Sequence, residues 1–260
     1  MFKKIYWIFK TQVGFDILCF YNSLRGLPKY LIDLYKFKKI YKGKLNYLPC
    51  LNDRFEKLGF TSSEYFWQDL LVSQWIFNAN PRKHADIGSR IDGFVAHIAS
   101  FRHLEVLDIR KIKIKVSKVT FRQIDLMSSK QVAAFVKKNG YFDSLSCLHV
   151  LEHFGLGRYG DKVNRFGYEQ GLQCMAKLLE KNGILYLSTQ VGPARVEFNS
   201  NFVFQPNHIC NIFARLNFKL IKLAILDKNG KLKNILKESK SNNFLMSQDN
   251  LAIFVAKKLF

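Results

Sequence analysis

The fold is decided by one stretch, KHADIGSRIDGFVAHIASFRHLEVLD, which runs from Lys83 to Asp108. A short apolar run ends at Gly88, and a turn-rich loop leads to an apolar-periodic segment between Phe94 and Phe101. A second apolar run ends at Asp108. The order strand, loop, helix, strand predicts the βαβ unit of a parallel sheet.

The same stretch predicts a ligand site. Gly88 and Gly93 let the backbone pass close to a ligand at the carboxyl end of the first strand, where open α/β sheets bind ligands. Asp108 lies 20 residues beyond Gly88, the spacing at which an acid takes a pair of ribose hydroxyls. A nucleoside-bearing cofactor is therefore expected, and the alternative is a βα turn that holds no ligand.

The rest of the chain continues the alternation of strands and helices. Further strands are expected at 119–126, 142–151 and 184–190, further helices at 129–139, 168–179 and 206–216, and a closing strand pair at 218–226 and 251–256. The predicted fold class is α/β, with a mostly parallel sheet, an antiparallel closing strand and an N-terminal helical extension. We place the extension at residues 1–80 and the α/β domain at 81–260.

The N-terminal extension is basic and aromatic. A helix is predicted to begin at Pro28 and to run through KYLIDLYKFKKIYK, with one apolar and one strongly positive face. Such a helix either caps the main domain or lies on an anionic membrane surface, so residues 1–45 are a candidate membrane contact.

Composition limits the remaining possibilities. The formal charge of +21 favours acidic partners, although the basic residues are mostly scattered lysines. Five well-separated cysteines without a C-x-x-C pair fit neither a zinc ribbon nor a disulfide framework and point to a reducing cytoplasm. The first residues lack a signal-peptide core, and no apolar run is long enough to span a membrane. The expected location is cytoplasmic. If residues 1–45 bind lipid, the protein would lie peripherally at the inner membrane surface.

Five strands alternating with helices and then a closing strand pair resemble the class I S-adenosylmethionine-dependent methyltransferases over about residues 82–257. The segments ADIGSRIDGFVAHIASF, FDSLSCLHVLEHFGLGRYGD and VGPARVEFN are more closely similar to a bacterial family of uncharacterised methyltransferase-like proteins. The resemblance implies a Rossmann-like class I methyltransferase fold and S-adenosylmethionine as the cofactor. It implies contacts to that cofactor from three strand ends: Asp86 and Gly88 at the methionine end, Asp108 at the ribose, and Asp125 with Leu126 at the adenine.

The segment after the fourth strand carries the candidate catalytic residues. His149 to His153 match the zinc-peptidase pattern H-x-x-E-H, but the following glycines break the helix that this pattern needs. In small-molecule methyltransferases, which this segment resembles, such residues serve the acceptor. Glu152 and His153 are therefore expected to hold or deprotonate the acceptor, with Tyr159 in a loop beside them. The alternative is that Glu152 and His153 form a structural pair.

Arg195, Glu197 and Asn199 follow the fifth strand at the ligand edge of the sheet. They either grip a polar acceptor such as a sugar or form a salt-bridged loop. The leading prediction is methyl transfer to a small or glycan-like polar acceptor. RNA methylation is disfavoured because no RNA-binding module is recognisable, and a nicotinamide dehydrogenase because G-x-G-x-x-G is missing. A non-catalytic scaffold that docks on a membrane or a partner is the third alternative.

Overall fold

The computed structural model describes residues 2–55, 64–226, 232–234 and 249–260, and the chain divides into two compact units, Met1–Phe60 and Thr61–Phe260. The division lies earlier than the predicted boundary at residue 80. The reason is helix α3 (Glu64–Ala79), which packs its buried Val72 and Ile76 into a core of the second unit. Ser62 and Ser63, which we expected to cap this helix, lie outside the described residues.

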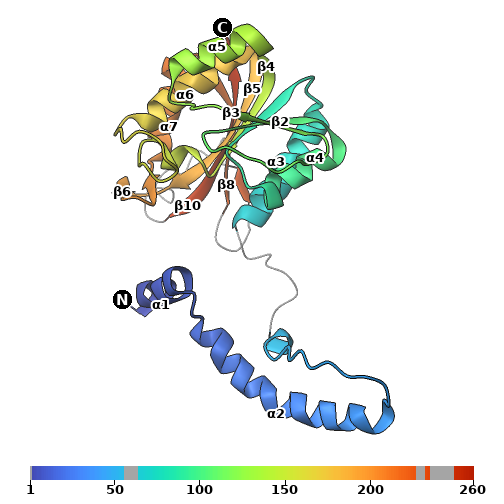
Figure 1. Cartoon of the computed structure of the whole chain (residues 1–260). Coiled ribbons are helices and arrows are strands. Elements are labelled where there is room, and N and C mark those ends of the chain that lie inside the picture. Colours follow the sequence, from blue (N-terminus) through green and yellow to red (C-terminus); the bar gives the residue numbers. More distant parts are fainter. Residues whose placement is uncertain (1, 56–63, 227–231, 235–248) are drawn as a thin grey trace. The chain divides into compact units, whose positions relative to one another are not determined.

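The first unit is helical (Figure 1). It contains α1 (Phe2–Ile8), a π-helical turn (Phe9–Val13), α2 (Ile17–Ile40) and a 3₁₀ turn (Asp53–Phe55). The prediction that a helix begins at Pro28 was wrong, because Pro28 lies inside α2. The start is set by Asp16, whose carboxylate accepts from the N–H groups of Leu18 and Cys19 at 2.9 and 3.2 Å.

The second unit is built on an eight-stranded sheet in the order β3-β2-β1-β4-β5-β10-β8-β9. Strands β1 to β5 pair in parallel, and β10 runs antiparallel to both β5 and β8. The bounds are β1 (His84–Ile87), β2 (Leu104–Asp108), β3 (Val119–Gln123), β4 (Phe142–Leu148), β5 (Leu179–Val191), β8 (Phe218–Leu226), β9 (Leu232–Asn234) and β10 (Asn250–Lys258). The predicted α/β class with a mostly parallel sheet and an antiparallel closing strand is confirmed.

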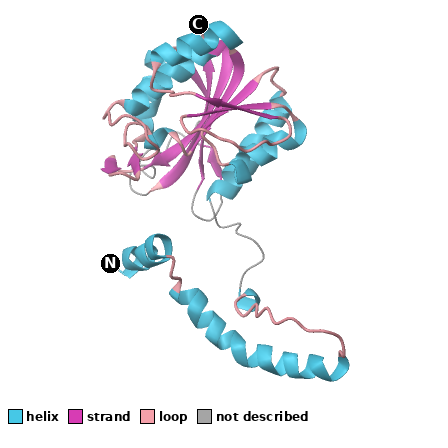
Figure 2. Cartoon of the chain, in the orientation of Figure 1, coloured by secondary structure: helices cyan, strands magenta, loops and turns pink. Residues whose placement is uncertain are grey.

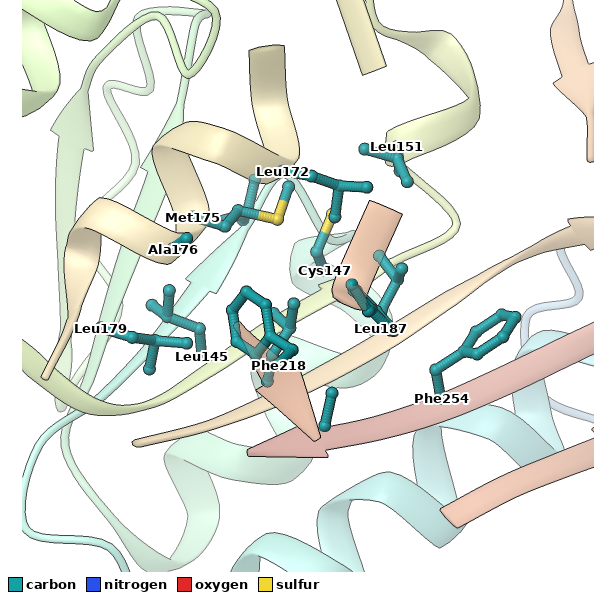
Figure 3. Close-up of a cluster of buried hydrophobic side chains, with 14 of the residues drawn as sticks. Leu145, Cys147, Leu151, Leu172, Met175, Ala176, Leu179, Leu187, Phe218 and Phe254 are labelled. Carbon is teal, nitrogen blue, oxygen red and sulfur yellow. The ribbon is translucent and has the colours of Figure 1, made fainter. Parts of the chain in front are cut away.

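Helices cover both faces of the sheet (Figure 2). One face carries α5 (Ser129–Asn139), α6 (Gly167–Leu178) and α7 (Pro206–Arg215), and the other carries α3 and α4 (Ala96–Phe101), as Figure 1 shows. Because side chains alternate along a strand, each face has its own core. The larger core packs Leu145, Cys147 and Leu187 of the sheet against Leu172 and Met175 of α6 (Figure 3).

Two element ends differ from the expectation and matter for the site. The predicted helix at 94–101 is α4 preceded by a π-helical turn, Ile91–Val95, in which Gly93 departs from helical backbone angles. The fourth strand ends at Leu148 rather than at residue 151, because His149 takes a left-handed conformation with φ of 56°. A 3₁₀ turn, Leu151–His153, follows and moves Glu152 off the line of the strand.

Candidate functional site

The candidate site lies at the carboxyl ends of β1 and β2, where the strand order reverses between β1 and β4. Gly88 has φ of 66°, and its N–H donates to the carbonyl oxygen of Leu107 at 3.0 Å. This bond places Gly88 beside Asp108, so the glycine and the acid that the sequence paired across 20 residues are neighbours in space. A Cβ at Gly88 would lie 2.9 Å from Val150 Cγ1, which gives a second reason for glycine here.

Asp86 is fully buried at the centre of a hydrogen-bonded network. Its Oδ1 accepts from Ser146 Oγ at 2.6 Å and from Ser89 Oγ at 2.9 Å, and its Oδ2 accepts from Ser89 N at 3.0 Å. Burial raises the pKa of Asp86 to about 6, although the hydrogen bonds from Ser146 and Ser89 favour the charged form. The carboxylate therefore orders the turn after β1 from beneath, and the backbone of that turn is what a ligand would meet.

His84 extends this network along the sheet. Its Nδ1 lies 2.8 Å from Ser144 Oγ and its Nε2 lies 3.2 Å from Ser146 Oγ. Because Ser146 Oγ donates to Asp86, it accepts from His84, which places the imidazole proton on Nε2. Burial lowers the pKa of His84 to about 3, so the ring is neutral, and its hydrogen bonds join β1 to β4.

Asp108, at the end of β2, is 5% exposed, and its carboxylate is held by Arg110. The backbone N and Nε of Arg110 donate to Oδ1 at 2.7 and 2.9 Å, and one terminal nitrogen donates to Oδ2 at 2.6 Å. The guanidinium carbon also lies 4.9 Å from the centre of the Tyr159 ring. Three of about four lone-pair positions on the carboxylate are thus occupied, and a ribose diol needs Arg110 to release at least one.

Gly93 is explained by a contact within the chain. A Cβ at this position would lie 2.7 Å from Oδ2 of Asp69, a residue of α3 that is 8% exposed. Burial raises the pKa of Asp69, while hydrogen bonds from Gln68 and from the backbone of Phe94 lower it. The sequence assigned Gly93 to the cofactor, whereas in the structure its missing side chain makes room for Asp69.

Asp125 and Leu126 lie just beyond β3, and the structure separates their roles. Asp125 is partly exposed, and its Oδ1 accepts from the N–H of Met127 at 2.8 Å. Leu126 is 4% exposed and belongs to the larger core between the sheet and its helices. Of the two residues expected at the adenine, only Asp125 presents a polar side chain outside the core.

Glu152 pairs with His149 and not with its chain neighbour His153. His149 Nδ1 lies 2.9 Å from Glu152 Oε1, and Thr189 Oγ1 donates to Oε2 at 3.1 Å. Burial raises the pKa of Glu152, but the hydrogen bonds that its carboxylate accepts, with that from His149 first, outweigh this effect, so the net pKa lies below its ordinary value. Both carboxylate oxygens are thus satisfied within a turn that is closed to solvent.

The other ring nitrogen of His149 is left over. Its side chain is 4% exposed, and Nε2 is buried without a hydrogen-bond partner among the residues that the structure describes. The Tyr65 ring of α3 packs against the imidazole with ring centres 4.5 Å apart. A neutral ring with its proton on Nδ1, donated to Glu152, would carry a lone pair on Nε2. A buried acceptor without a donor is costly, and a ligand hydroxyl would satisfy it.

His153 faces a different part of the site. Its Nδ1 donates to the carbonyl oxygen of Ser200 at 2.7 Å, and its ring meets that of Tyr159 edge-on at 5.5 Å. Burial lowers the pKa of His153 against the opposing charge of Glu152. Within the described residues no group of three or more His, Cys, Asp or Glu side chains is placed to hold a metal ion.

Tyr159 stands in a loop ordered by Asp161. The two carboxylate oxygens of Asp161 accept from the N–H groups of Gly155, Gly157 and Tyr159 at 2.8, 3.2 and 3.2 Å. The loop thereby brings the Tyr159 ring to Arg110 on one side and to His153 on the other. It links the ends of β2 and β4.

Arg195 and Glu197 lie on β6 (Arg195–Glu197), which pairs with β7 (Asn201–Val203) in a separate small hairpin. The Arg195 guanidinium donates to Glu197 at 2.9 Å and to both oxygens of Asp249 at 2.8 and 2.7 Å. Asn199 is exposed in the connecting turn. These contacts match the salt-bridged loop that the sequence left open as an alternative.

Four residues of the site, Arg110, Tyr65, Gln68 and His149, were not predicted from the sequence. Arg110 lay in a basic spacer, and Tyr65 and Gln68 lay in a helix that we placed in the N-terminal extension. Gln68 is 1% exposed, accepts from Ser188 Oγ and donates to Asp69 at 2.9 Å, so α3 is part of the site. The three-residue step from His149 to Glu152 was a signal, because it places two side chains on one side of a turn.

Comparison with solved structures defines the fold. The chain is similar to the 1,6-didemethyltoxoflavin-N1-methyltransferase of Burkholderia thailandensis, with 13% identity, a TM-score of 0.52, and coverage of 74% of this chain and 79% of that one. It is also similar to the magnesium protoporphyrin IX methyltransferase of Synechocystis PCC 6803, with 14% identity, a TM-score of 0.49, and coverage of 79% and 90%. The first of these matches shows that the chain has the Rossmann-like methyltransferase fold, and an identity this low speaks to the fold alone.

The family is one of unknown function. A family model described as "Caenorhabditis protein of unknown function, DUF268" matches residues 95–259, and the chain belongs to this family. The expected bacterial origin of the family is corrected by that description, whereas the expectation of an uncharacterised family is confirmed. No curated protein matches the chain.

Proposed function

We propose that this protein transfers a methyl group from S-adenosylmethionine to a hydroxyl or amino group of a small or glycan-like polar acceptor. The observation that carries the proposal is the placement of Gly88 beside Asp108 at the reversal point of the sheet, through the hydrogen bond to Leu107. A positive-φ glycine and a strand-end acid side by side suit the methionine and ribose parts of a nucleoside cofactor.

The residues present fit this cofactor on one condition. Asp108 would accept the ribose hydroxyls once Arg110 turns away, and Arg110 is free to do so because its side chain is 50% exposed. The ribose hydroxyls would then replace the hydrogen bonds from the guanidinium, which is already half in water. The backbone of the turn after Asp86 and Gly88 would receive the methionine end, and Asp125 the adenine amine. When bound, the cofactor would supply an electrophilic methyl group on a sulfonium.

The acceptor side of the proposal rests on the buried pair of His149 and Glu152. The oxygen or nitrogen that takes the methyl group must lose its proton, and a neutral imidazole oriented by a carboxylate is suited to receive it. With its proton on Nδ1, the neutral His149 ring would present the lone pair of Nε2, which has no hydrogen-bond partner among the described residues. His153 and Tyr159, whose rings contact each other in the neighbouring part of the site, would help to position the acceptor.

A calorimetric titration of the full-length protein tests the cofactor. We expect S-adenosylmethionine and S-adenosylhomocysteine to bind with micromolar-class affinity and NAD not to bind. Heat from NAD alone would replace this proposal with a dehydrogenase. A flat titration with all three, on protein shown to be folded by circular dichroism, would leave the non-catalytic scaffold as the better account.

A further inference from the structure

Helix α2 has a continuous apolar face that no part of its own unit covers within the described residues. Apolar residues recur at steps of three and four, and the helix is a full 24 residues long. The face comprises Ile17, Phe20, Leu24, Leu27, Leu31, Leu34 and Tyr35. Leu24 and Leu31 are 54% and 53% exposed, and Tyr35 is 63% exposed. A folded unit rarely leaves such a face in water without a partner.

The opposite face of α2 is the one that the chain itself covers. Gly26 is buried there, and a Cβ at this position would collide with the carbonyl oxygen of Leu51. The Arg25 guanidinium lies 4.8 Å from the centre of the Phe55 ring. The segment after α2 thus returns along the polar side of the helix and leaves the apolar side outward.

Charge accompanies the apolar face at its carboxyl end. Lys36, Lys38 and Lys39 close the helix, and Lys42 and Lys44 follow it. The acids nearby are already engaged, because Asp16 pairs with Lys10 at 2.7 Å and Asp33 pairs with Lys29. The five lysines form no ion pair with an acid in the part of the chain that the structure describes. They are available to an anionic partner.

We propose that the first unit lies on the surface of a bilayer rich in anionic lipid, with the apolar face of α2 at the acyl boundary and the five lysines among the headgroups. An amphipathic helix with a wide apolar face and basic residues is the type that binds in the plane of a membrane. No helix among the described residues is long and apolar enough to cross one. Trp7 on α1, 57% exposed, is of the type that settles at headgroup level.

A second copy of the chain is the competing occupant, since the apolar steps also suit a helix pair. The sequence of α2 argues against it. The next position on the seam after Leu34 is Lys38, with Lys39 beside it, and a helix pair would bury an ammonium group there. At a membrane the same lysines reach the phosphates by extending their stems.

The test uses the full-length protein and vesicles of phosphatidylcholine with or without phosphatidylglycerol, followed by co-sedimentation. We expect binding to the phosphatidylglycerol vesicles, weak binding to pure phosphatidylcholine, and a steep loss of binding as salt rises. Leu31→Glu should lower partitioning by about tenfold or more, because a charge replaces a side chain in the acyl region. Cys19→Glu, which adds the same charge at an exposed position on the side of the helix away from the apolar face, is the matched control and should bind nearly as the wild type does.

A second variant separates charge from burial. Lys38→Gln with Lys39→Gln should weaken binding to anionic vesicles by roughly fivefold for each lysine and leave the small affinity for neutral vesicles unchanged. Absence of binding by the wild type overturns the proposal. If the wild type is then a dimer that Leu31→Glu dissociates, a second copy covers the face. If Leu31→Glu instead lowers the melting temperature of a monomer, another part of the chain covers it. The calorimetric titration with S-adenosylmethionine tests the proposed function separately, so a failure of that proposal can be told apart from a failure of this one.

Discussion

At the scale of single residues, the site is defined by how its charged groups are already paired. Asp108 carries the strand-end carboxylate on which the ribose contact depends, and Arg110 occupies most of it. An exposed guanidinium and a nucleoside diol therefore compete for the same oxygens. The competition predicts opposite effects for the two residues.

Asp108→Ala should weaken S-adenosylmethionine binding by about 1 to 3 kcal/mol, because the ribose hydroxyls lose charge-assisted hydrogen bonds. Arg110→Ala should strengthen it by up to about 1 kcal/mol, the usual scale of a solvent-accessible ion pair. Calorimetry on both variants measures the two effects. Weaker binding after Arg110→Ala would mean that Arg110 contacts the cofactor itself and is no competitor.

The proton acceptor is the second question at this scale. His149→Asn keeps an amide that can donate to Glu152 but removes Nε2, so turnover should fall by about 10²- to 10⁴-fold, the range for a lost general base. Cofactor affinity should hold, and so should the melting temperature. The measurement is transfer of labelled methyl to a panel of methyl glycosides and small alcohols or amines, together with a melting curve.

His153→Ala is the comparison for that prediction. Its Nδ1 is committed to Ser200, so we expect a smaller loss of turnover than for His149→Asn. If His153→Ala shows the larger loss, the base is the residue that the sequence favoured, and His149 is a structural partner of Glu152. Early melting of His149→Asn with normal turnover per folded molecule would lead to the same conclusion.

At the scale of elements, the loop from Gly155 to Gly167 carries Tyr159, whose ring contacts Arg110 after β2 and His153 after β4. Its glycines are not equivalent. Gly155 has φ of 82°, and a Cβ there would collide with the carbonyl oxygen of Asn164, whereas Gly160 has φ of 86° and open space around it. The same substitution at the two positions separates backbone strain from a steric clash.

Gly155→Ala should destabilise the protein by roughly 2 to 4 kcal/mol, because strain at positive φ adds to a clash with backbone that cannot yield. Gly160→Ala should cost about 1 to 2 kcal/mol, from strain alone. Urea denaturation of both variants with unchanged slopes gives the comparison. Equal losses would show that the loop can move away from Asn164, and the rigid link to Tyr159 would then be wrong.

The elements also show which features of the fold and of the candidate site could be predicted from the sequence. Alternating apolar runs such as Ala85–Ile87 and Leu104–Leu107 predicted the parallel strands, because hydrophobic periodicity is local. Gly88 and Asp108 were found for the same reason, through a fixed spacing. The role of α3 was not predicted, since Gln68 reaches Ser188 across 120 positions of the chain, and no local pattern encodes that contact. Spacing also does not reveal that Glu152 pairs with His149 rather than with His153. That pairing depends on the left-handed backbone at His149.

At the scale of the whole molecule, the cations that give the formal charge of +21 differ in whether an acid pairs with them. Several cations form ion pairs within the protein: Arg195 pairs with Asp249 and Glu197, and Arg110 pairs with Asp108. The lysines that close α2 form no ion pair with an acid among the described residues, and they are concentrated on one element. The charge at the end of α2 is thus suited to an anionic surface.

The two compact units predict a selective response to the cofactor. Ligand that binds the folded α/β unit at a free concentration of about 100 times its Kd adds about 2.7 kcal/mol to stability. For a unit of this size that corresponds to a rise in Tm of roughly 5 to 10 °C. Differential scanning calorimetry with S-adenosylhomocysteine should show this rise in wild type and in Leu31→Glu alike, because α2 lies in the other unit.

Asp108→Ala is the control that ties the rise to the proposed site. Binding weaker by about 1 to 3 kcal/mol should remove about 1 to 2.4 kcal/mol of the added stability at the same ligand concentration, and with it between roughly a third and nearly all of the shift. An equal shift in Asp108→Ala would place the nucleoside elsewhere on the protein. A shift that Leu31→Glu abolishes would mean that the face of α2 packs on the α/β unit when the ligand is bound, which contradicts independent units and removes the membrane as the occupant of that face.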